Sequence, residues 1–173
     1  CALATANGIG AIGIIRISGN QSFEIVNKVF QGKNLEKADS HTVHYGFILE
    51  NQEPRAKSQD SENFNQQPTT DNQIDEVMVS VFRAPKTFTA EDSVEISFHG
   101  SPHIAKKILE VLIKNGARMA QAGEFTMRAF MNGRIDLSQA ESIADLIASE
   151  NEASRKVALN QLKGGITNEI SIL

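Results

Sequence analysis

Residues 94–115, VEISFHGSPHIAKKILEVLIKN, join a strand pattern directly to a helix pattern and thereby decide the fold class. Apolar and polar side chains alternate strictly at the start of this stretch, which is typical of a strand with one buried face. Ser101 is a suitable N-cap, Pro102 a suitable first helical residue, and Gly116 a suitable terminator. The apolar residues of the helix share one face. The segment therefore predicts a helix packed on a sheet.

Further strands are predicted from short runs rich in β-branched residues, at residues 1–5, 11–17, 42–49 and 76–82. The turn after residue 17 contains Asn20 and Ser22, either of which can cap a helix over residues 23–30. Together these elements predict an α+β fold, with a mixed β-sheet covered by helices.

The polar stretch from Glu50 to Gln73 separates two of the predicted strands. It is rich in Gln, Asn, Ser and Asp, and Phe64 is its only large apolar residue. Such a segment cannot bury enough surface to offset its ordering entropy. We therefore predict that residues 50–73 form a long, mobile loop between the two strands of a hairpin.

The pattern becomes purely helical after about residue 132. Ser138 and Glu141 have the spacing of a capping box, and a long helical pattern runs to Leu162. A Gly-Gly pair interrupts it, and a further amphipathic turn then stops without a cap. We expect an amino-terminal domain over residues 1–132 and the truncated start of an α-helical bundle domain over residues 133–173.

The charge of the chain argues against unaided binding of nucleic acid. Its net charge is −4 and its isoelectric point about 5.6. Nucleic-acid-binding surfaces usually carry a basic patch, and the longest basic cluster is Lys106-Lys107. If RNA is a substrate, most of the binding must come from elsewhere.

Composition and the amino-terminal sequence indicate the cellular compartment of the protein. We expect a cytoplasmic protein without a membrane segment, because no apolar run is long enough and no signal peptide is recognisable. A single cysteine fits a reducing compartment. Because the sequence starts at Cys1 and not Met, we expect residues upstream. Four scattered histidines do not have ligand spacing, so no metal site is predicted.

The glycines Gly8, Gly10 and Gly13 match the spacing of the dinucleotide-binding fingerprint. That motif needs a helix amino terminus after the glycines, but a strand pattern follows them. No GxxxxGK[ST] motif and no recognisable catalytic triad occur either. We predict no catalytic residue in this chain.

Three charged residues are candidates for a binding site. Arg16 shares a strand face with Ile12 and Ile14, where a guanidinium must find an anion or acceptors. Glu95 lies on the polar face of its strand, and Arg134 lies in an Asn-Gly-Arg turn. From spacing alone, Arg16 can also form a structural ion pair or lie at a sheet edge. Glu95 can simply be exposed to solvent, and Arg134 can cap the turn or be solvated.

Several blocks of sequence carry a resemblance to a known family. They are residues 11–19 (AIGIIRISG), 75–77 (DEV), 84–85 (AP), 87–100 (TFTAEDSVEISFHG), 122–141 (AGEFTMRAFMNGRIDLSQAE) and 144–147 (ADLI). In this order they resemble the amino-terminal part of the MnmE (TrmE) family of tRNA-modifying GTPases, together with the start of its helical domain.

The resemblance implies a module that binds 5-formyltetrahydrofolate and forms a homodimer. By motif, the folate-contacting residues would be Arg16, Glu95 and Arg134, the last at a position where the family often has lysine. A carboxylate can accept a pair of hydrogen bonds from the ring N–H and amino group of a pterin. Arginines suit the carboxylates of a glutamyl tail or a polarised carbonyl.

For the full-length family, the resemblance implies GTP hydrolysis in a separate G domain that uses potassium and magnesium. With the flavoprotein MnmG (GidA), such a protein installs an aminomethyl-type group on the wobble uridine of tRNA. Without a P-loop, this chain is predicted to be inactive as a GTPase. Two alternatives remain. One is a dimerisation scaffold without folate, suggested by residues 5–10 (TANGIG), where the family commonly has Thr-Pro-Pro-Gly-Arg-Gly. The other is a folate-dependent aminomethyltransferase-like protein.

Overall fold

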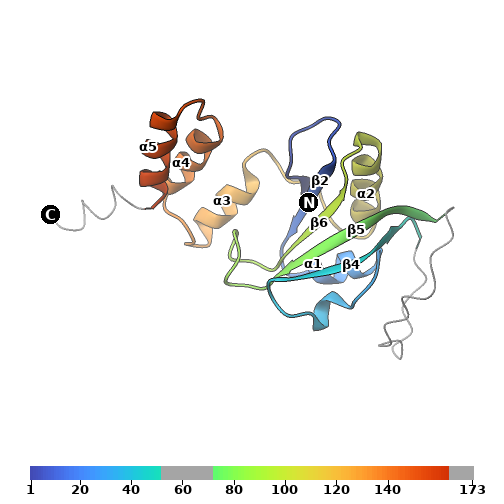
Figure 1. Ribbon diagram of the computed structural model, residues 1–173. Coiled ribbons are helices and arrows are strands. Elements are labelled where there is room, and N and C mark those ends of the chain that lie inside the picture. Colours follow the sequence, from blue (N-terminus) through green and yellow to red (C-terminus); the bar gives the residue numbers. More distant parts are fainter. Residues whose placement is uncertain (52–71, 164–173) are drawn as a thin grey trace. The chain divides into compact units, whose positions relative to one another are not determined.

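The computed structural model describes residues 1–51 and 72–163, which belong to two compact units (Figure 1). The first unit comprises residues 1–87 and 91–121, and the second comprises residues 88–90 with the chain from residue 122 onward. The predicted domains, residues 1–132 and 133–173, divide the chain differently and stay a prediction.

The first unit contains β1 (Ala2–Leu3), β2 (Ile12–Ser18), α1 (Ser22–Asn27), β3 (Phe30–Gln31), the 3-10 helix η1 (Leu35–Lys37), β4 (Thr42–Leu49), β5 (Gln73–Phe82), β6 (Ser93–His99) and α2 (Pro102–Lys114). The second contains α3 (Glu124–Met131), α4 (Leu137–Ile147) and α5 (Glu152–Leu162).

The described strands form one six-stranded sheet in the order β1-β2-β6-β5-β4-β3. Every pair in it is antiparallel. The predicted α+β class is confirmed, but the expectation of a mixed sheet is wrong. A parallel pair requires two adjacent strands that run the same way. β2 and β3, which flank α1, run the same way, but β6, β5 and β4 lie between them.

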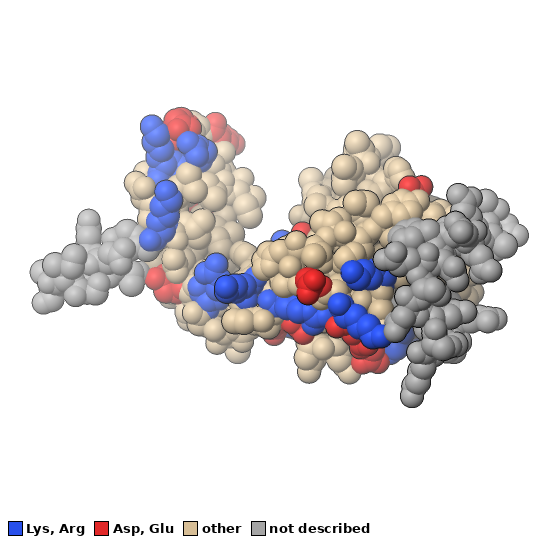
Figure 2. All heavy atoms as spheres, turned by 60° about the horizontal axis from the view of Figure 1, so that its bottom comes forward, with Lys and Arg blue, Asp and Glu red and all other residues tan. Residues whose placement is uncertain are grey.

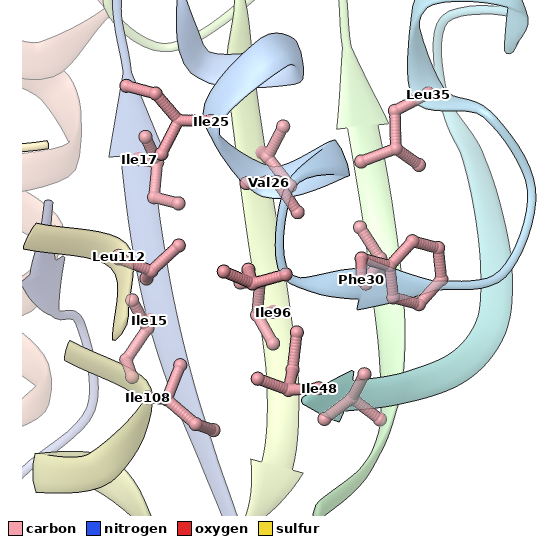
Figure 3. Packing of buried hydrophobic residues seen from close by; sticks show 14 of the residues in the cluster. Ile15, Ile17, Ile25, Val26, Phe30, Leu35, Ile48, Ile96, Ile108 and Leu112 are labelled. Atoms are coloured by element: carbon pink, nitrogen blue, oxygen red, sulfur yellow. The ribbon is translucent and has the colours of Figure 1, made fainter. Parts of the chain in front are cut away.

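Helices α1 and α2 cover one face of this sheet, and the core lies between them and the strands (Figure 3). Ile15, Ile96 and Val79 are neighbours on β2, β6 and β5, and each is 0% exposed. From α2, Ile108 and Leu112 are equally buried, as their spacing of four residues on one helical face predicts. The opposite face, which these helices do not cover, is called the open face below.

The helix after β2 is shorter than predicted. It ends at Asn27, and Phe30, which was expected in the helix, begins strand β3. Neither Asn20 nor Ser22 is its N-cap, because that position is taken by Gln21, whose side chain makes no cap hydrogen bond. An apolar residue at this point suits a helix face or a strand equally well, and tertiary pairing decides between them.

Helix α2 begins and ends where the sequence predicts. Ser101 is its N-cap and Pro102 its first residue, although the Ser101 hydroxyl makes no cap hydrogen bond. After the helix, Gly116 has a φ of 111°, which favours glycine. This helix and strand β6 are thus joined by a short turn.

Strands β4 and β5 pair antiparallel as the two arms of a hairpin, as predicted. Asn51 and Asn72 close the described ends of its loop, with the Asn51 N–H donating to Asn72 Oδ1 at 2.9 Å and Asn72 Nδ2 donating to the Asn51 carbonyl at 2.6 Å. The predicted mobility of residues 50–73 falls mainly on residues 52–71, which lie outside the described residues.

The capping box of α4 lies two positions before the predicted one. The N-cap is Asp136, whose carboxylate accepts from the Gln139 N–H at 2.8 Å, while Gln139 Oε1 accepts from the Asp136 N–H at 2.9 Å. The predicted box of Ser138 and Glu141 is therefore wrong. An aspartate at the N-cap satisfies a helix amino terminus as well as serine does, so spacing alone could not choose between the two boxes.

The predicted long helix to Leu162 is also wrong, because α4 and α5 are separate. Asn151 caps α5, and its Oδ1 accepts from the Ser154 N–H at 2.9 Å. Asparagine favours a cap over a helix interior, because its side chain competes for backbone hydrogen bonds. The helical turn predicted after the Gly-Gly pair lies outside the described residues.

Candidate functional site

Arg16 and Glu95 face each other on neighbouring strands β2 and β6, on the open face. Arg16 Nε and Nη2 lie 2.8 and 2.7 Å from the same carboxylate oxygen, Glu95 Oε1. The two side chains are 26% and 24% exposed. The sequence required an anion for this guanidinium, and the strand register supplies one. The pair is thus a partly buried ion pair within the first unit.

Glu95 keeps one oxygen available for a ligand. Among residues 1–51 and 72–163, its Oε2 has no hydrogen-bond partner. Its other oxygen is occupied by Arg16, which holds the carboxylate in one orientation. The desolvation penalty of a partly buried carboxylate is offset best when its remaining lone pairs accept hydrogen bonds. Glu95 can therefore accept N–H groups of a ligand that approaches the open face.

Arg134 belongs to the second unit and follows the end of α3. The turn is a Schellman motif, in which the Gly133 N–H donates to the Phe130 carbonyl at 2.9 Å and the Arg134 N–H to the Ala129 carbonyl at 2.8 Å. Gly133 has a φ of 67°, as the motif requires. The side chain of Arg134 is exposed and has no polar partner among the described residues. The structure thus brings Arg16 and Glu95 together and places Arg134 in the other unit.

The sequence did not single out a second polar pair, Asp75 of β5 with His99 of β6. Asp75 Oδ1 lies 2.8 Å from His99 Nδ1, and Oδ2 accepts from the His99 backbone N–H at 2.8 Å. Asp75 is buried, whereas the His99 ring is 69% exposed. The hydrogen bond to Asp75, followed by its charge and that of Glu76, raises the pKa of His99 above its ordinary value of 6.5. An acidic residue at the start of a mainly apolar strand was the available signal.

Replacing Asp75 by asparagine should remove this shift. We expect the pKa of His99 to fall toward its ordinary value, because the variant loses the carboxylate that favours the imidazolium. Stability contributed by the pair is fully present below pH 6.5 and is lost as the pH rises through the folded-state pKa. NMR titration of the histidine ring protons, with urea unfolding at each pH, measures both effects.

His44 is the internal control for that titration. Its pKa is lowered by burial and then by the charge of Lys33, neither of which involves Asp75. It should therefore titrate identically in both proteins. An unchanged His99 titration in Asp75→Asn would show that the pair does not hold the proton in solution.

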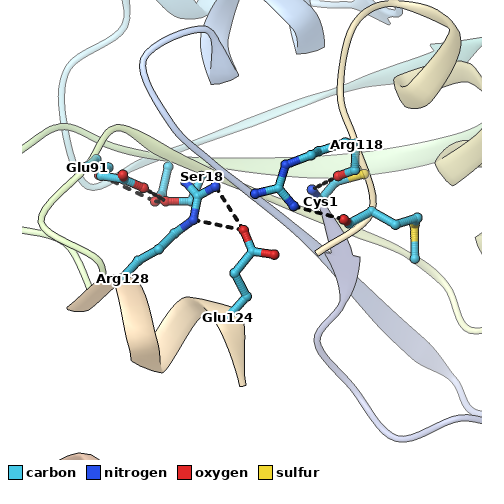
Figure 4. A network of polar contacts seen from close by, with 8 residues as sticks. Cys1, Ser18, Glu91, Arg118, Glu124 and Arg128 are labelled. Carbon is cyan, nitrogen blue, oxygen red and sulfur yellow. Dashed lines mark hydrogen bonds and ion pairs between the residues drawn. The ribbon is translucent and has the colours of Figure 1, made fainter. Parts of the chain in front are cut away.

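Each unit contains a further polar contact between side chains that Figure 4 shows. In the first unit, the Ser18 hydroxyl donates to Glu91 Oε2 at 2.9 Å, which ties the end of β2 to the loop before β6. In the second, Arg128 Nε donates to Glu124 Oε1 at 3.0 Å, and Glu124 is only 5% exposed. Each of these contacts lies within one unit.

Basic and acidic side chains are intermixed on the face shown in Figure 2. Several basic residues are neutralised locally, as in the pairs Lys28–Glu24 at 2.8 Å and Arg155–Glu152 at 2.7 Å. Within the described residues, no helix is long and apolar enough to cross a bilayer. The same residues contain no cluster of three or more potential metal ligands.

Comparison with known proteins shows which family this chain is similar to. A family model described as "GTP-binding protein TrmE N-terminus" matches residues 1–134. The "tRNA modification GTPase MnmE" of Streptococcus thermophilus is 52% identical over 170 residues, which cover 98% of this chain and 33% of that protein. The proteins of the same name from Cytophaga hutchinsonii and Flavobacterium johnsoniae are 51% and 47% identical, over 98% and 99% of this chain and 33% and 34% of their own lengths.

The fold and the site define an α+β domain with helices on one face of an antiparallel sheet and an ion pair on the other. The chain belongs to the MnmE (TrmE) family of tRNA modification GTPases and corresponds to its amino-terminal region. It spans about a third of the length of the curated relatives it matches.

Proposed function

We propose that this chain is a module that binds 5-formyltetrahydrofolate and pairs two copies of the protein. The observation that supports it best is the partly buried Glu95, which Arg16 orients while Oε2 has no partner among the described residues. This carboxylate suits the adjacent N–H and amino donors of a pterin. Arg134, which the motif also assigns to the folate, remains a predicted contact.

The activity of the whole protein is a wider proposal that follows from family membership. It acts in the cytoplasm as a GTPase whose separate G domain uses potassium and magnesium. With the flavoprotein MnmG it places an aminomethyl-type group on the wobble uridine of tRNA, and the folate supplies the one-carbon unit. The net charge of −4 supports assigning much of the tRNA binding to the partner.

Isothermal titration calorimetry with 5-formyltetrahydrofolate tests the folate function. We expect Glu95→Gln to weaken binding by about tenfold to a hundredfold, because hydrogen bonds to a charged group contribute about 1.5–3 kcal/mol. Glu110→Gln, an exposed glutamate on α2, is the matched control and should bind like the wild type. Absence of binding by the wild-type chain would favour the scaffold without folate.

Analytical ultracentrifugation tests the pairing function. We expect a concentration-dependent dimer, whereas a chain that stays monomeric at tens of micromolar would refute pairing by this part alone. Membership of the MnmE family over residues 1–134 disfavours the aminomethyltransferase-like alternative.

A further inference from the structure

The sequence contains three Asn-Gly dipeptides, at residues 7–8, 115–116 and 132–133. In such a dipeptide the backbone nitrogen of the glycine can attack the side-chain amide carbon of the asparagine, because glycine has no Cβ that obstructs the approach. The bond from the nitrogen to Cγ forms, the bond from Cγ to Nδ2 breaks, and ammonia leaves with the proton of the glycine N–H. Water then opens the cyclic imide to aspartate or isoaspartate. Only water is consumed, so the structure decides which of the three dipeptides reacts.

The dipeptide at the end of α2 is held in an unreactive arrangement. Asn115 Nδ2 donates to the Val111 carbonyl at 2.8 Å, and the Gly116 N–H donates to the Ile113 carbonyl at 3.1 Å. The Asn115 side chain is also half-buried. Both reacting groups are thus engaged, and the local helix end must open before they can meet.

The dipeptide at the end of α3 is held in the same way. Asn132 Nδ2 donates to the Thr89 carbonyl at 2.7 Å, and the Gly133 N–H donates to the Phe130 carbonyl at 2.9 Å. All four residues belong to the second unit. Here too, the leaving group and the attacking nitrogen each take part in a hydrogen bond.

The remaining dipeptide lies in the loop between β1 and β2, which is anchored at both ends. Before the dipeptide, Thr5 Oγ1 accepts from the Ile14 N–H at 3.3 Å. After it, the Gly10 N–H donates to the Gly100 carbonyl at 2.9 Å. Residues 6–9, between the two anchors, are all exposed. A change within residues 6–9 therefore leaves both anchors in place.

Asn7 and Gly8 have none of the contacts that hold the other two dipeptides. In the part of the chain that the structure describes, neither the Asn7 side-chain amide nor the Gly8 N–H has a hydrogen-bond partner. In the same part, nothing outside the adjacent residues lies within 4 Å of the position that a Cβ on Gly8 would occupy. The attacking nitrogen is therefore free, and the cyclic imide has room to form.

We propose that Asn7 is a site of spontaneous modification, at which the folded chain is converted to aspartate and isoaspartate while Asn115 and Asn132 keep their amides. The product carries one more negative charge in the loop, and isoaspartate also lengthens the backbone there. Exposed loop tips tolerate such changes best. This assignment is independent of the proposed folate function, because none of its residues is assigned to the folate.

Incubation of the folded chain in mildly alkaline buffer, followed by digestion and mass spectrometry of the peptides, tests the assignment. Conversion replaces the amide –NH2 by –OH, which changes the peptide mass, and labelling by an isoaspartate-specific methyltransferase identifies the isoaspartate. We expect Asn7 to convert at least about tenfold faster than Asn115 or Asn132, because at those two sites hydrogen bonds must break before the reaction.

The same incubation in urea provides the matched comparison. In the unfolded chain all three dipeptides lose their local structure, so they should convert at similar rates. Asn7→Gln should abolish the isoaspartate labelling of the folded chain, because glutamine would have to close a larger and less favourable ring. Asn115→Gln, the control substitution, should leave the labelling unchanged.

Two results would overturn the proposal. One is conversion of Asn115 or Asn132 as fast as that of Asn7 in the folded chain, which would mean that their hydrogen bonds do not protect them. The other is an Asn7 that keeps its amide in the folded chain, whether or not it converts in urea, because the loop would then hold the dipeptide in an unreactive arrangement.

Discussion

Replacement of Phe30 by alanine is expected to lower the free energy of unfolding by about 3–5 kcal/mol, the usual range for a buried phenylalanine. Phe30 is 0% exposed and lies in the main core of the first unit (Figure 3). Its ring packs directly on Gly32 and Gly46, where an added Cβ would overlap it. Because these glycines have no side chains, they cannot fill the cavity that the substitution leaves. Urea unfolding followed by circular dichroism measures the loss.

The control for Phe30 is Ile9→Ala in the same unit. Ile9 is 94% exposed, so its truncation should change the free energy of unfolding by no more than about 0.5 kcal/mol. If the two variants were equally stable, Phe30 would not contribute to the core in solution.

Replacement of Arg83 by alanine is expected to lower the free energy of unfolding by about 2–4 kcal/mol. Arg83 follows β5, and its guanidinium lies 4.7 Å from the ring centroid of Phe23. It also donates hydrogen bonds to three backbone carbonyls around η1, those of Ala38 at 2.9 Å, Leu35 at 3.1 Å and Glu36 at 2.6 Å. Alanine removes the Arg83 donor from all three carbonyls, and only that of Leu35 keeps a backbone donor among the described residues, the Ala38 N–H at 3.3 Å. Thermal and urea unfolding give the measurement.

Two variants bracket the Arg83 result. Arg83→Lys keeps the charge but not the planar fork of donors, so it should recover only part of the loss. Lys28→Ala removes an exposed pair with Glu24 and should change the free energy of unfolding by no more than about 0.5 kcal/mol. If Arg83→Ala were as mild as Lys28→Ala, the contacts with η1 would not contribute to stability in solution.

The fold was predictable where one local pattern excluded the alternatives. Strict alternation in β6 and the apolar face of α2 correctly predicted both elements, and the β4 segment was predicted at residues 42–49. The pattern failed at Phe30, which suits a helix or a strand, and at Ser138, which lies two residues after the true cap. In both cases the local sequence allowed two solutions, and packing chose one.

The site was predictable residue by residue but not as an arrangement. Arg16 attracted notice because a guanidinium on an apolar strand face needs an anion. Its partner Glu95 is 79 positions away in sequence, and only the register of β2 on β6 brings the two together. The pair of Asp75 and His99 was missed for the same reason, since it joins two strands whose adjacency the sequence does not state.

The sequence by itself determined the family, the α+β class and the identity of the charged candidates, because these depend on residue types and short-range periodicity. The tertiary structure alone decided that the sheet is antiparallel throughout its described strands and that Glu95 pairs with Arg16. Hydrogen bonds between distant strands set that register. Which strands pair, and in which register, is selected because one face of the sheet must be buried against α1 and α2. No local stretch of sequence encodes that pairing.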